Sequence, residues 1–239
     1  MTRVLGLPLA PVLPLRFCPL PGPLYTVLMG YKESPIDEAR QRYGPMVGRL
    51  LAALLVRHAP CLIAAAGGPL DLVLPVPSTA RPGPSPLSRV EGLSELVDLP
   101  AGLQATWHPA LLQRTGHPVG HMRPHPHAFE VPEADRRVVA GSRILLVDDT
   151  YVSGARSQSA AAALRLAGAR AVLISPVGRV LRPDRSASHA AFLARAVQAT
   201  NANIANNAIN VNSHRPVDDE PCGRCVLTQM VDQTVAGTG

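Results

Sequence analysis

The sequence contains few aromatic residues, few charged residues and a single lysine. Phe, Trp and Tyr make up 3% of its 239 residues, and the four charged residue types make up 17%. Proteins that bind unpaired bases stack them on aromatic side chains, so the scarcity of aromatics argues against that class. Apart from Lys32, the basic residues are arginines that are scattered along the chain. The net charge of +6 therefore does not indicate a basic nucleic-acid-binding tail.

Cysteines and long apolar runs are also scarce. Four cysteines at uneven spacing exclude a disulfide-rich secreted scaffold. Prolines interrupt the apolar N-terminus, and no stretch of about 18 apolar residues indicates a membrane span or a signal peptide. We therefore expect a cytoplasmic protein with no membrane partner. Its hydrophobic fraction of 46% is enough to build a core, and its length suits one α/β domain with a small accessory lobe.

The apolar pattern predicts alternating strands and helices. We expect strands at 70–76, 104–112, 143–147 and 171–177, and helices at 24–32, 35–58, 88–96, 157–168 and 187–199. The last strand–helix–strand run is a βαβ unit, which implies a parallel sheet. Residues 1–23 are proline-rich and are expected to lie extended over the surface. Residues 200–212 are Asn-rich and are expected to be irregular, before a disordered tail from about 231.

The sharpest motif is ILLVDDTYVSGARS, residues 144–157. A buried parallel strand brings Asp148 and Asp149 to the sheet edge where open α/β folds bind ligands, so two carboxylates face a crevice. Vicinal ribose hydroxyls are donors, and carboxylates are acceptors. The following turn into a helix offers backbone N–H groups to a phosphate, and Ser153 and Gly154 suit that turn. The alternative is an aspartate that only caps a helix or turn. Two adjacent aspartates before Ser-Gly and a helix favour a sugar-phosphate site.

This segment is similar to the phosphoribosyl pyrophosphate (PRPP) motif of type I phosphoribosyltransferases. The resemblance implies a parallel twisted sheet flanked by helices, with a small hood built from both termini. It also implies that Asp148 and Asp149 are the catalytic pair on the ribose hydroxyls, and Asp149 is a candidate general base. The residues implied for the 5-phosphate are Thr150, Tyr151, Val152, Ser153, Gly154, Ala155, Arg156 and Ser157. Val152 and Arg156 depart from the family, which usually has hydroxyl residues at these positions.

Other segments resemble the ComF branch of that family, the competence-associated phosphoribosyltransferase-like proteins. Residues 73–78 (VLPVPS) are similar to its pyrophosphate loop, which makes Ser78, Thr79 and Arg81 the implied pyrophosphate-binding residues. Residues 113–131 resemble its flexible loop, with Gln113 and Arg123 as the implied contacts. Residues 24–32 resemble its Tyr-Lys element. Lys32 is either retained for its compact ammonium group or is a chance survivor on a solvated face.

Two groups of residues, one of cysteines and one of histidines, are candidate metal ligands. Cys222 and Cys225 have the C-x-x-C spacing of a structural Zn²⁺ site. Cys18 is a candidate third ligand, and His214, His189 and Cys61 are candidates for the fourth; the alternative is unligated thiols. Prolines lie between the histidines of the 113–127 segment, so no helix aligns them and a solvated loop is the prediction. These histidines are His117, His121, His125 and His127.

The hypothesis is a Mg²⁺-dependent phosphoribosyltransferase that uses PRPP and releases pyrophosphate, with an unidentified acceptor. Its expected parts are an N-terminal extension (1–35), an α/β core (36–182) and a C-terminal hood segment with the C-x-x-C pair and a flexible tail (183–239). The expected assembly is a homodimer. Two alternatives remain: a non-catalytic PRPP or nucleotide sensor, and a ComF-like accessory protein in DNA uptake or processing, which would bind nucleic acid.

Overall fold

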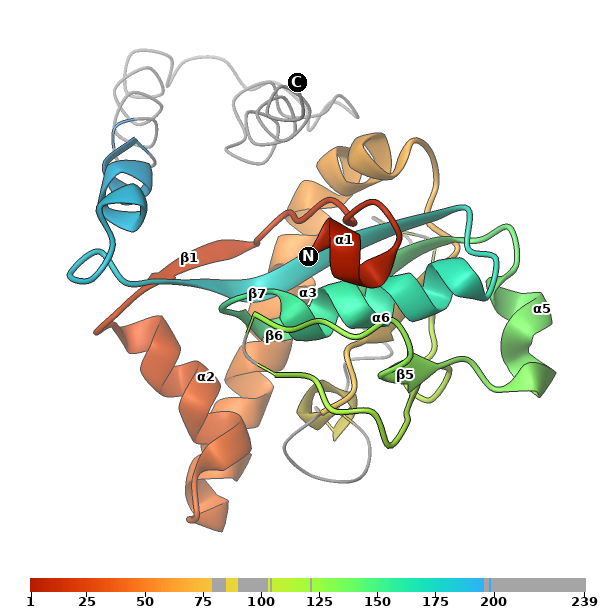
Figure 1. The fold of residues 1–239 in the computed structure, drawn as a ribbon. Coiled ribbons are helices and arrows are strands. Elements are labelled where there is room, and N and C mark those ends of the chain that lie inside the picture. The colour runs from red at the N-terminus through yellow and green to blue at the C-terminus, as the bar shows by residue number, and fades with distance from the viewer. Residues whose placement is uncertain (79–84, 90–102, 104, 121, 196–197, 199–239) are drawn as a thin grey trace, which may run out of the picture.

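The protein folds around a five-stranded parallel sheet with helices on both faces, as the sequence predicts (Figure 1). The computed structural model describes residues 1–78, 85–89, 103, 105–120, 122–195 and 198. Strand order is β1-β7-β6-β2-β3, and every pairing in this sheet is parallel. The sheet strands are β1 (Arg16–Pro19), β2 (Leu72–Pro75), β3 (Thr106–Trp107), β6 (Arg143–Tyr151) and β7 (Ala171–Leu181).

The helices and a small hairpin complete the described part of the chain. The two main strands of the sheet, β6 and β7, are joined by α6 in a βαβ unit. The remaining elements are α1 (Thr2–Leu5), α2 (Pro23–Glu33), α3 (Asp37–Ala66), η1 (Pro86–Arg89), β4 (Gln113–Arg114), β5 (Phe129–Glu130), η2 (Glu133–Asp135), α5 (Arg136–Val139) and α6 (Ala155–Leu166). Strands β4 and β5 pair antiparallel.

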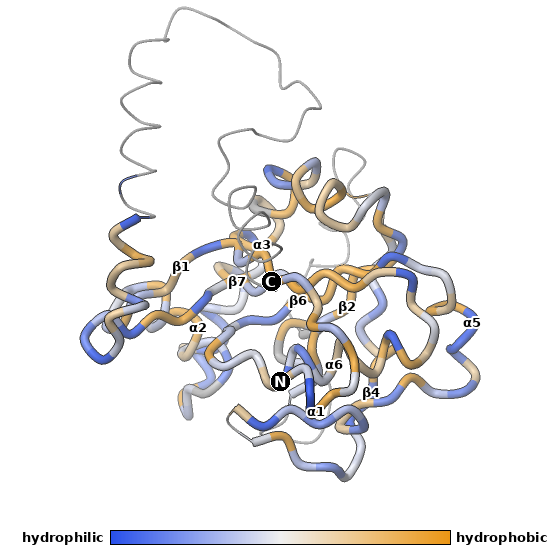
Figure 2. Tube along the Cα trace, turned by 45° about the horizontal axis from the view of Figure 1, so that its top comes forward, coloured by the Kyte–Doolittle hydropathy of each residue, from blue (hydrophilic) through white to orange (hydrophobic). Residues whose placement is uncertain are grey.

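Each face of the sheet has its own apolar cluster. Leu145 and Val147 of β6 pack with α2 and α3, whereas Ile144 and Leu146 pack with α6. This follows from the strand period of two, because successive side chains point to opposite faces. Strand β2 and residues 144–147 of β6 are apolar (Figure 2), as expected for parallel strands covered on both sides.

The N-terminal segment is more ordered than its prolines suggest. Instead of lying extended over the surface, it forms α1 and supplies β1, which pairs with β7 at the sheet edge. Leu13, Leu15 and Cys18 are buried in the same cluster as α3. The chain is extended in β1, as predicted, but its predicted place on the surface is wrong, because an edge strand needs only one ladder of hydrogen bonds and accommodates Pro19 at its end.

Helix α3 continues beyond the predicted end at residue 58. It passes through Pro60 to Ala66, although a helical proline removes a hydrogen bond and bends the chain. Burial of Ala59, Cys61 and Leu62 in the core accounts for the continuation.

No single helix in the described ranges is long and apolar enough to cross a membrane. The two arms of α3, Asp37–Ala53 and Leu55–Ala66, pass that test only together, and they are bent by 51°.

Several predicted boundaries shift in the structure. The predicted strands at 143–147 and 171–177 are confirmed but extend to Tyr151 and Leu181. The predicted strand at 104–112 is reduced to the two residues of β3. Residues 187–195 are helical, as predicted. The predicted helix at 88–96, the Asn-rich segment and the tail lie wholly or mostly outside the described residues.

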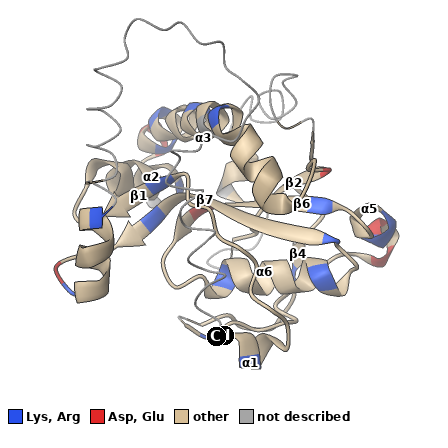
Figure 3. Ribbon diagram, turned by 90° about the horizontal axis from the view of Figure 1, so that it is seen from above, with Lys and Arg blue, Asp and Glu red and all other residues tan. Residues whose placement is uncertain are grey.

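The basic side chains are distributed over several elements. Figure 3 shows Lys and Arg on α2, α3, α5, α6 and the strands, with acidic residues in only a few places. This distribution agrees with the scattered arginines of the sequence. Within the described part of the chain it provides no single basic stripe of the kind that follows a nucleic-acid backbone.

Candidate functional site

The end of β6 projects beyond its neighbour β2. The β2–β6 pairing ends at Pro75 and Val147, with one more bond from the Val76 N–H to the Val147 carbonyl at 2.8 Å. Pairing with β7 continues as far as Tyr151. Asp148 and Asp149 therefore stand just past the end of β2, at the carboxyl edge of the sheet. This edge is where parallel α/β folds place their ligands.

The two aspartates point to opposite faces of the sheet. Asp148 contacts α6, and Asp149 contacts α2. The sequence predicted that both carboxylates face one crevice after the strand has ended. Because β6 continues through both residues, they alternate like any strand neighbours. Both are buried, with exposures of 4% and 6%, so each needs compensating partners.

Asp149 is held by three side chains. The Lys32 ammonium lies 2.9 Å from its Oδ1, and the Tyr31 hydroxyl donates to its Oδ2 at 2.6 Å. The Thr150 hydroxyl donates to Oδ1 at 2.7 Å and accepts from Lys32 at 2.9 Å. Burial alone would raise the pKa of Asp149, but Lys32, Tyr31 and Thr150 together lower it. Asp149 is therefore the carboxylate that stays ionised.

Lys32 is thus part of the site. Its side chain is 12% exposed, so the alternative of a chance survivor on a solvated face is wrong. Tyr31 was not among the predicted site residues, although it belongs to the Tyr-Lys element of the sequence. Burial and the neighbouring Asp149 raise the pKa of Tyr31, which keeps its hydroxyl a donor. Only the fold, which packs the last turn of α2 against the end of β6, brings these residues to Asp149.

Asp148 has a different environment on the α6 side. The Ser157 hydroxyl donates to its Oδ2 at 2.6 Å, and the Asp149 N–H donates to its Oδ1 at 3.0 Å. The guanidinium of Arg156 lies 3.8 Å from Oδ1. Burial raises the pKa of Asp148; Arg156 opposes that effect and the charge of Asp149 adds to it. Each buried aspartate therefore has one cationic neighbour.

The turn from β6 into α6 is tight and contains the predicted phosphate loop. Gly154 precedes the helix with φ 78° and ψ −2°, a left-handed conformation that favours glycine. A Cβ at Gly154 would lie 2.0 Å from the Tyr151 hydroxyl oxygen, so the ring of Tyr151 covers this position. Val152 is 53% exposed at the tip of the turn. The hydroxyls of Ser157 and Thr150 donate to the aspartates, whereas Ser153 accepts from the Met122 N–H instead.

The predicted loop at 113–131 lies against this turn. The Met122 N–H donates to Ser153 Oγ at 3.4 Å, and the His125 N–H donates to Ser159 Oγ at 2.9 Å. Arg123 is therefore next to a residue that touches the turn, whereas Gln113 lies in β4 opposite Glu130 and is not brought to the aspartates. Ser78 follows β2 at the same sheet edge; Thr79 and Arg81 lie outside the described residues.

The N-terminal segment is fastened to α6 by a residue that the sequence did not single out. Buried Gln158 accepts a hydrogen bond from the Ala10 N–H and donates one to the Ala10 carbonyl, both at 2.9 Å. The two bonds satisfy both backbone groups of Ala10. An isolated glutamine in an Ala-rich helix has no local signal for this role.

The metal hypotheses concern residues in two regions. Cys18 is fully buried, and burial raises the pKa of its thiol to about 11, which opposes the thiolate form. Cys222, Cys225 and His214 lie outside the described residues. The rings of His117 and His125 stack with centroids 4.5 Å apart, and His127 lies 6.3 and 6.0 Å from them. Within the described ranges no group of three or more His, Cys, Asp or Glu residues could hold a metal ion.

Comparison with known proteins assigns no family to the chain. No family model and no curated protein matches the chain. Nine chains of solved structures match, among them the allosteric regulatory enzyme of purine biosynthesis. That likeness has 23% identity and a TM-score of 0.31, and it covers 52% of this chain and 25% of the other. The chain thus matches about a quarter of that protein, too distantly to transfer any activity.

Proposed function

We propose that the protein binds PRPP and transfers its phosphoribosyl group to a nucleophile, with release of pyrophosphate. The observation that carries the proposal is the pair Asp148–Asp149 at the projecting end of β6, directly before a tight turn into α6. The resemblance of residues 144–157 to the PRPP motif supports the same function. The positive end of the helix and the backbone N–H groups of the turn suit the 5-phosphate.

The ribose would lie across the end of β6. In this placement its hydroxyls meet the carboxylates of Asp148 from the α6 side and Asp149 from the α2 side. Because the pKa of Asp149 is lowered, Asp149 is a poor general base, and we assign it to hold a ribose hydroxyl. The bond from C1 to the diphosphate breaks with its electron pair on pyrophosphate, and C1 bonds to the acceptor, which loses a proton. Residues 1–35 and 183–239 are proposed to cover the acceptor.

Mg²⁺ would accompany PRPP. Both carboxylates already have a cationic neighbour, so the residues fit an ion held mainly by the oxygens of the diphosphate and ribose and by water. Mg²⁺ commonly binds through phosphates and retained water in this way. The bound ion would offset charge on the leaving pyrophosphate. A structural Zn²⁺ at Cys222 and Cys225, with Cys18, and a homodimer are also proposed. Neither proposal depends on PRPP binding.

A PRPP or nucleotide sensor is the second candidate. The observation that favours it is the occupation of both carboxylates by the protein's own side chains, with Ser157 and Arg156 on Asp148. A ligand must displace or share these contacts, and sharing them supports binding without the exact alignment of the ribose that transfer requires. Exposed Val152, in place of a hydroxyl residue, leaves the phosphate with one donor fewer.

The test combines PRPP binding with pyrophosphate release over a panel of nucleobases. We expect PRPP binding in the wild type and at least a tenfold loss in Asp148→Asn, about the value of one charge-assisted contact. Asp71→Asn is the matched control, because Asp71 accepts from the Arg143 N–H at the opposite end of β6. Binding without turnover on any base would favour the sensor. Absent binding, or equal binding in both variants, would refute the site.

A further inference from the structure

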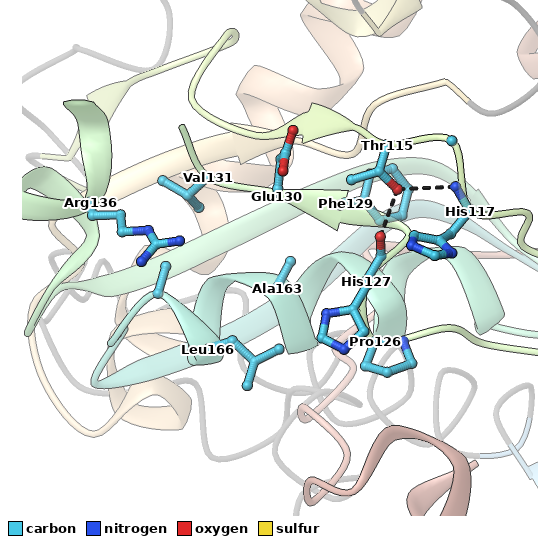
Figure 4. Close-up of a pocket in the computed structure, with 12 residues that line it drawn as sticks. Thr115, His117, Pro126, His127, Phe129, Glu130, Val131, Arg136, Ala163 and Leu166 are labelled. Carbon is cyan, nitrogen blue, oxygen red and sulfur yellow. Dashed lines mark hydrogen bonds between the residues drawn. The ribbon is translucent and has the colours of Figure 1, made fainter. Parts of the chain in front are cut away.

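One cavity among the described residues lies away from the sheet edge. It has a volume of about 710 Å³ and is bounded by the β4–β5 hairpin on one side and by α5 and the second half of α6 on the other (Figure 4). This size is within the usual range of small-molecule sites. Along α6, Ala163 is eight residues from Ala155, about 12 Å at 1.5 Å per residue. The cavity is therefore separate from the proposed PRPP site.

The wall formed by α6 is apolar. Ala163 and Leu166 face the cavity, and Leu166 is 56% exposed, unusual for a leucine on a helix that packs against a sheet. Phe129 of β5 lines the opposite wall. A flat apolar group inserted between α6 and the hairpin would cover Leu166. Covering this surface is favourable because apolar area leaves water.

The two ends of the cavity carry polar groups. Arg136 lies at one end, and His117 and His127 lie at the other (Figure 4). Arg136 pairs with Glu133 at 3.1 Å, but the two side chains are 58% and 83% exposed. Exposed ion pairs contribute little, so a ligand anion can readily replace Glu133. His117 stacks on His125 with one ring face, and the His127 ring lies 6.3 Å from His117, so this end of the cavity is lined by imidazoles.

We infer that this cavity binds a small organic acid with a planar ring, the acid group on Arg136 and the ring between Leu166 and the histidines. The same segment that lines the cavity also contacts the turn after β6. His127 and His117 are joined through Thr115, whose hydroxyl donates to the His127 carbonyl at 2.6 Å and accepts from the His117 N–H at 3.2 Å. Met122, in the same segment, reaches Ser153. An occupant would therefore stabilise the segment that lies on the turn.

Phenyl phosphate is a suitable probe, because its two parts can be tested alone as inorganic phosphate and as phenol. We expect it to bind the full chain more tightly than either part by calorimetric titration. Arg136→Gln should weaken binding about tenfold, the effect of losing one charge-assisted contact. Leu166→Glu should weaken it at least as much, since it replaces the apolar surface that the ring would cover by a hydrated carboxylate. Both positions are exposed, so the fold should tolerate both changes.

Arg137→Gln is the matched control. Arg137 is the exposed neighbour of Arg136 and does not line the cavity. If phenyl phosphate bound at the sheet edge, its affinity would be equal in the two arginine variants. A difference in affinity between them therefore indicates binding in the cavity. Equal affinity in both variants, an unchanged affinity in Leu166→Glu, or no binding at millimolar phenyl phosphate would each overturn the assignment. The result is independent of whether the protein binds PRPP.

Discussion

The ammonium of Lys32 lies 2.9 Å from Asp149 Oδ1 and joins the last turn of α2 to the end of β6. The two residues are 117 positions apart in the sequence, and both side chains are nearly buried. In a buried pair each charge is the main compensation for the other. Much of the local structure around the proposed site therefore depends on this contact.

Replacing Lys32 by methionine should destabilise the protein by about 3 kcal/mol, because Asp149 would then be buried without its cation. Urea unfolding measures the change. The double variant Lys32→Met with Asp149→Asn should recover part of the loss, since the uncompensated charge is gone. If the two single changes are simply additive, the contact is not coupled in the way described.

The two aspartates should respond oppositely to amidation. At pH 7, Asp148→Asn should raise the free energy of unfolding by about 1 kcal/mol, because it removes a buried charge whose pKa is raised by burial. Asp149→Asn should lower it by about 3 kcal/mol, because it leaves Lys32 without its partner. Thermal and urea unfolding of both variants check the signs. The same sign for both would contradict the described environments.

Stability should depend on pH through Asp149. Its folded pKa lies below its unfolded value of about 4, so its contribution is present above that pH and is lost as the pH falls through the folded pKa. The difference in unfolding free energy between wild type and Asp149→Asn should thus shrink below about pH 4. A difference that is constant from pH 7 to pH 3 would exclude an ionised Asp149.

Gly154→Ala should destabilise the protein by about 2 kcal/mol, because the residue has a left-handed φ and its Cβ would overlap the Tyr151 hydroxyl. Gly44→Ala is the control. Gly44 lies within α3 and directly before Pro45, with no other atom close to a Cβ, and alanine there should change stability by less than about 1 kcal/mol, because its helix propensity offsets the crowding of a Cβ before proline. Thermal unfolding of the two variants compares the sites directly. Equal effects would mean that the turn is not constrained.

Gln158→Ala should release the N-terminal segment from α6. The N–H and carbonyl of Ala10 would lose their partners, at about 2 kcal/mol in stability. Amide hydrogen exchange near Ala10 should become faster, while exchange in β6 should change little. Gln41→Ala, at an exposed position of α3, is the control and should change neither quantity by a measurable amount.

The sequence by itself determined the βαβ unit, the parallel sheet and the position of Asp148 and Asp149 at its carboxyl edge. These depend on local patterns: apolar runs of strand length, an Ala-rich helix and a glycine at its start. Other features came from tertiary structure. Packing between distant segments decided that β1 joins the sheet, that α3 continues through Pro60, and that β6 extends far enough to turn the two carboxylates to opposite faces.

Tertiary structure also decided the partners of those carboxylates. Nothing near Asp149 in the sequence indicates Tyr31 or Lys32, and nothing near Ala10 indicates Gln158. Such contacts arise when a buried polar group must find a partner, and the fold determines which distant side chain can reach it. Local sequence therefore determined where the proposed site lies along the chain. The packing of α2 and α6 against β6 determined which cations lie beside its two carboxylates.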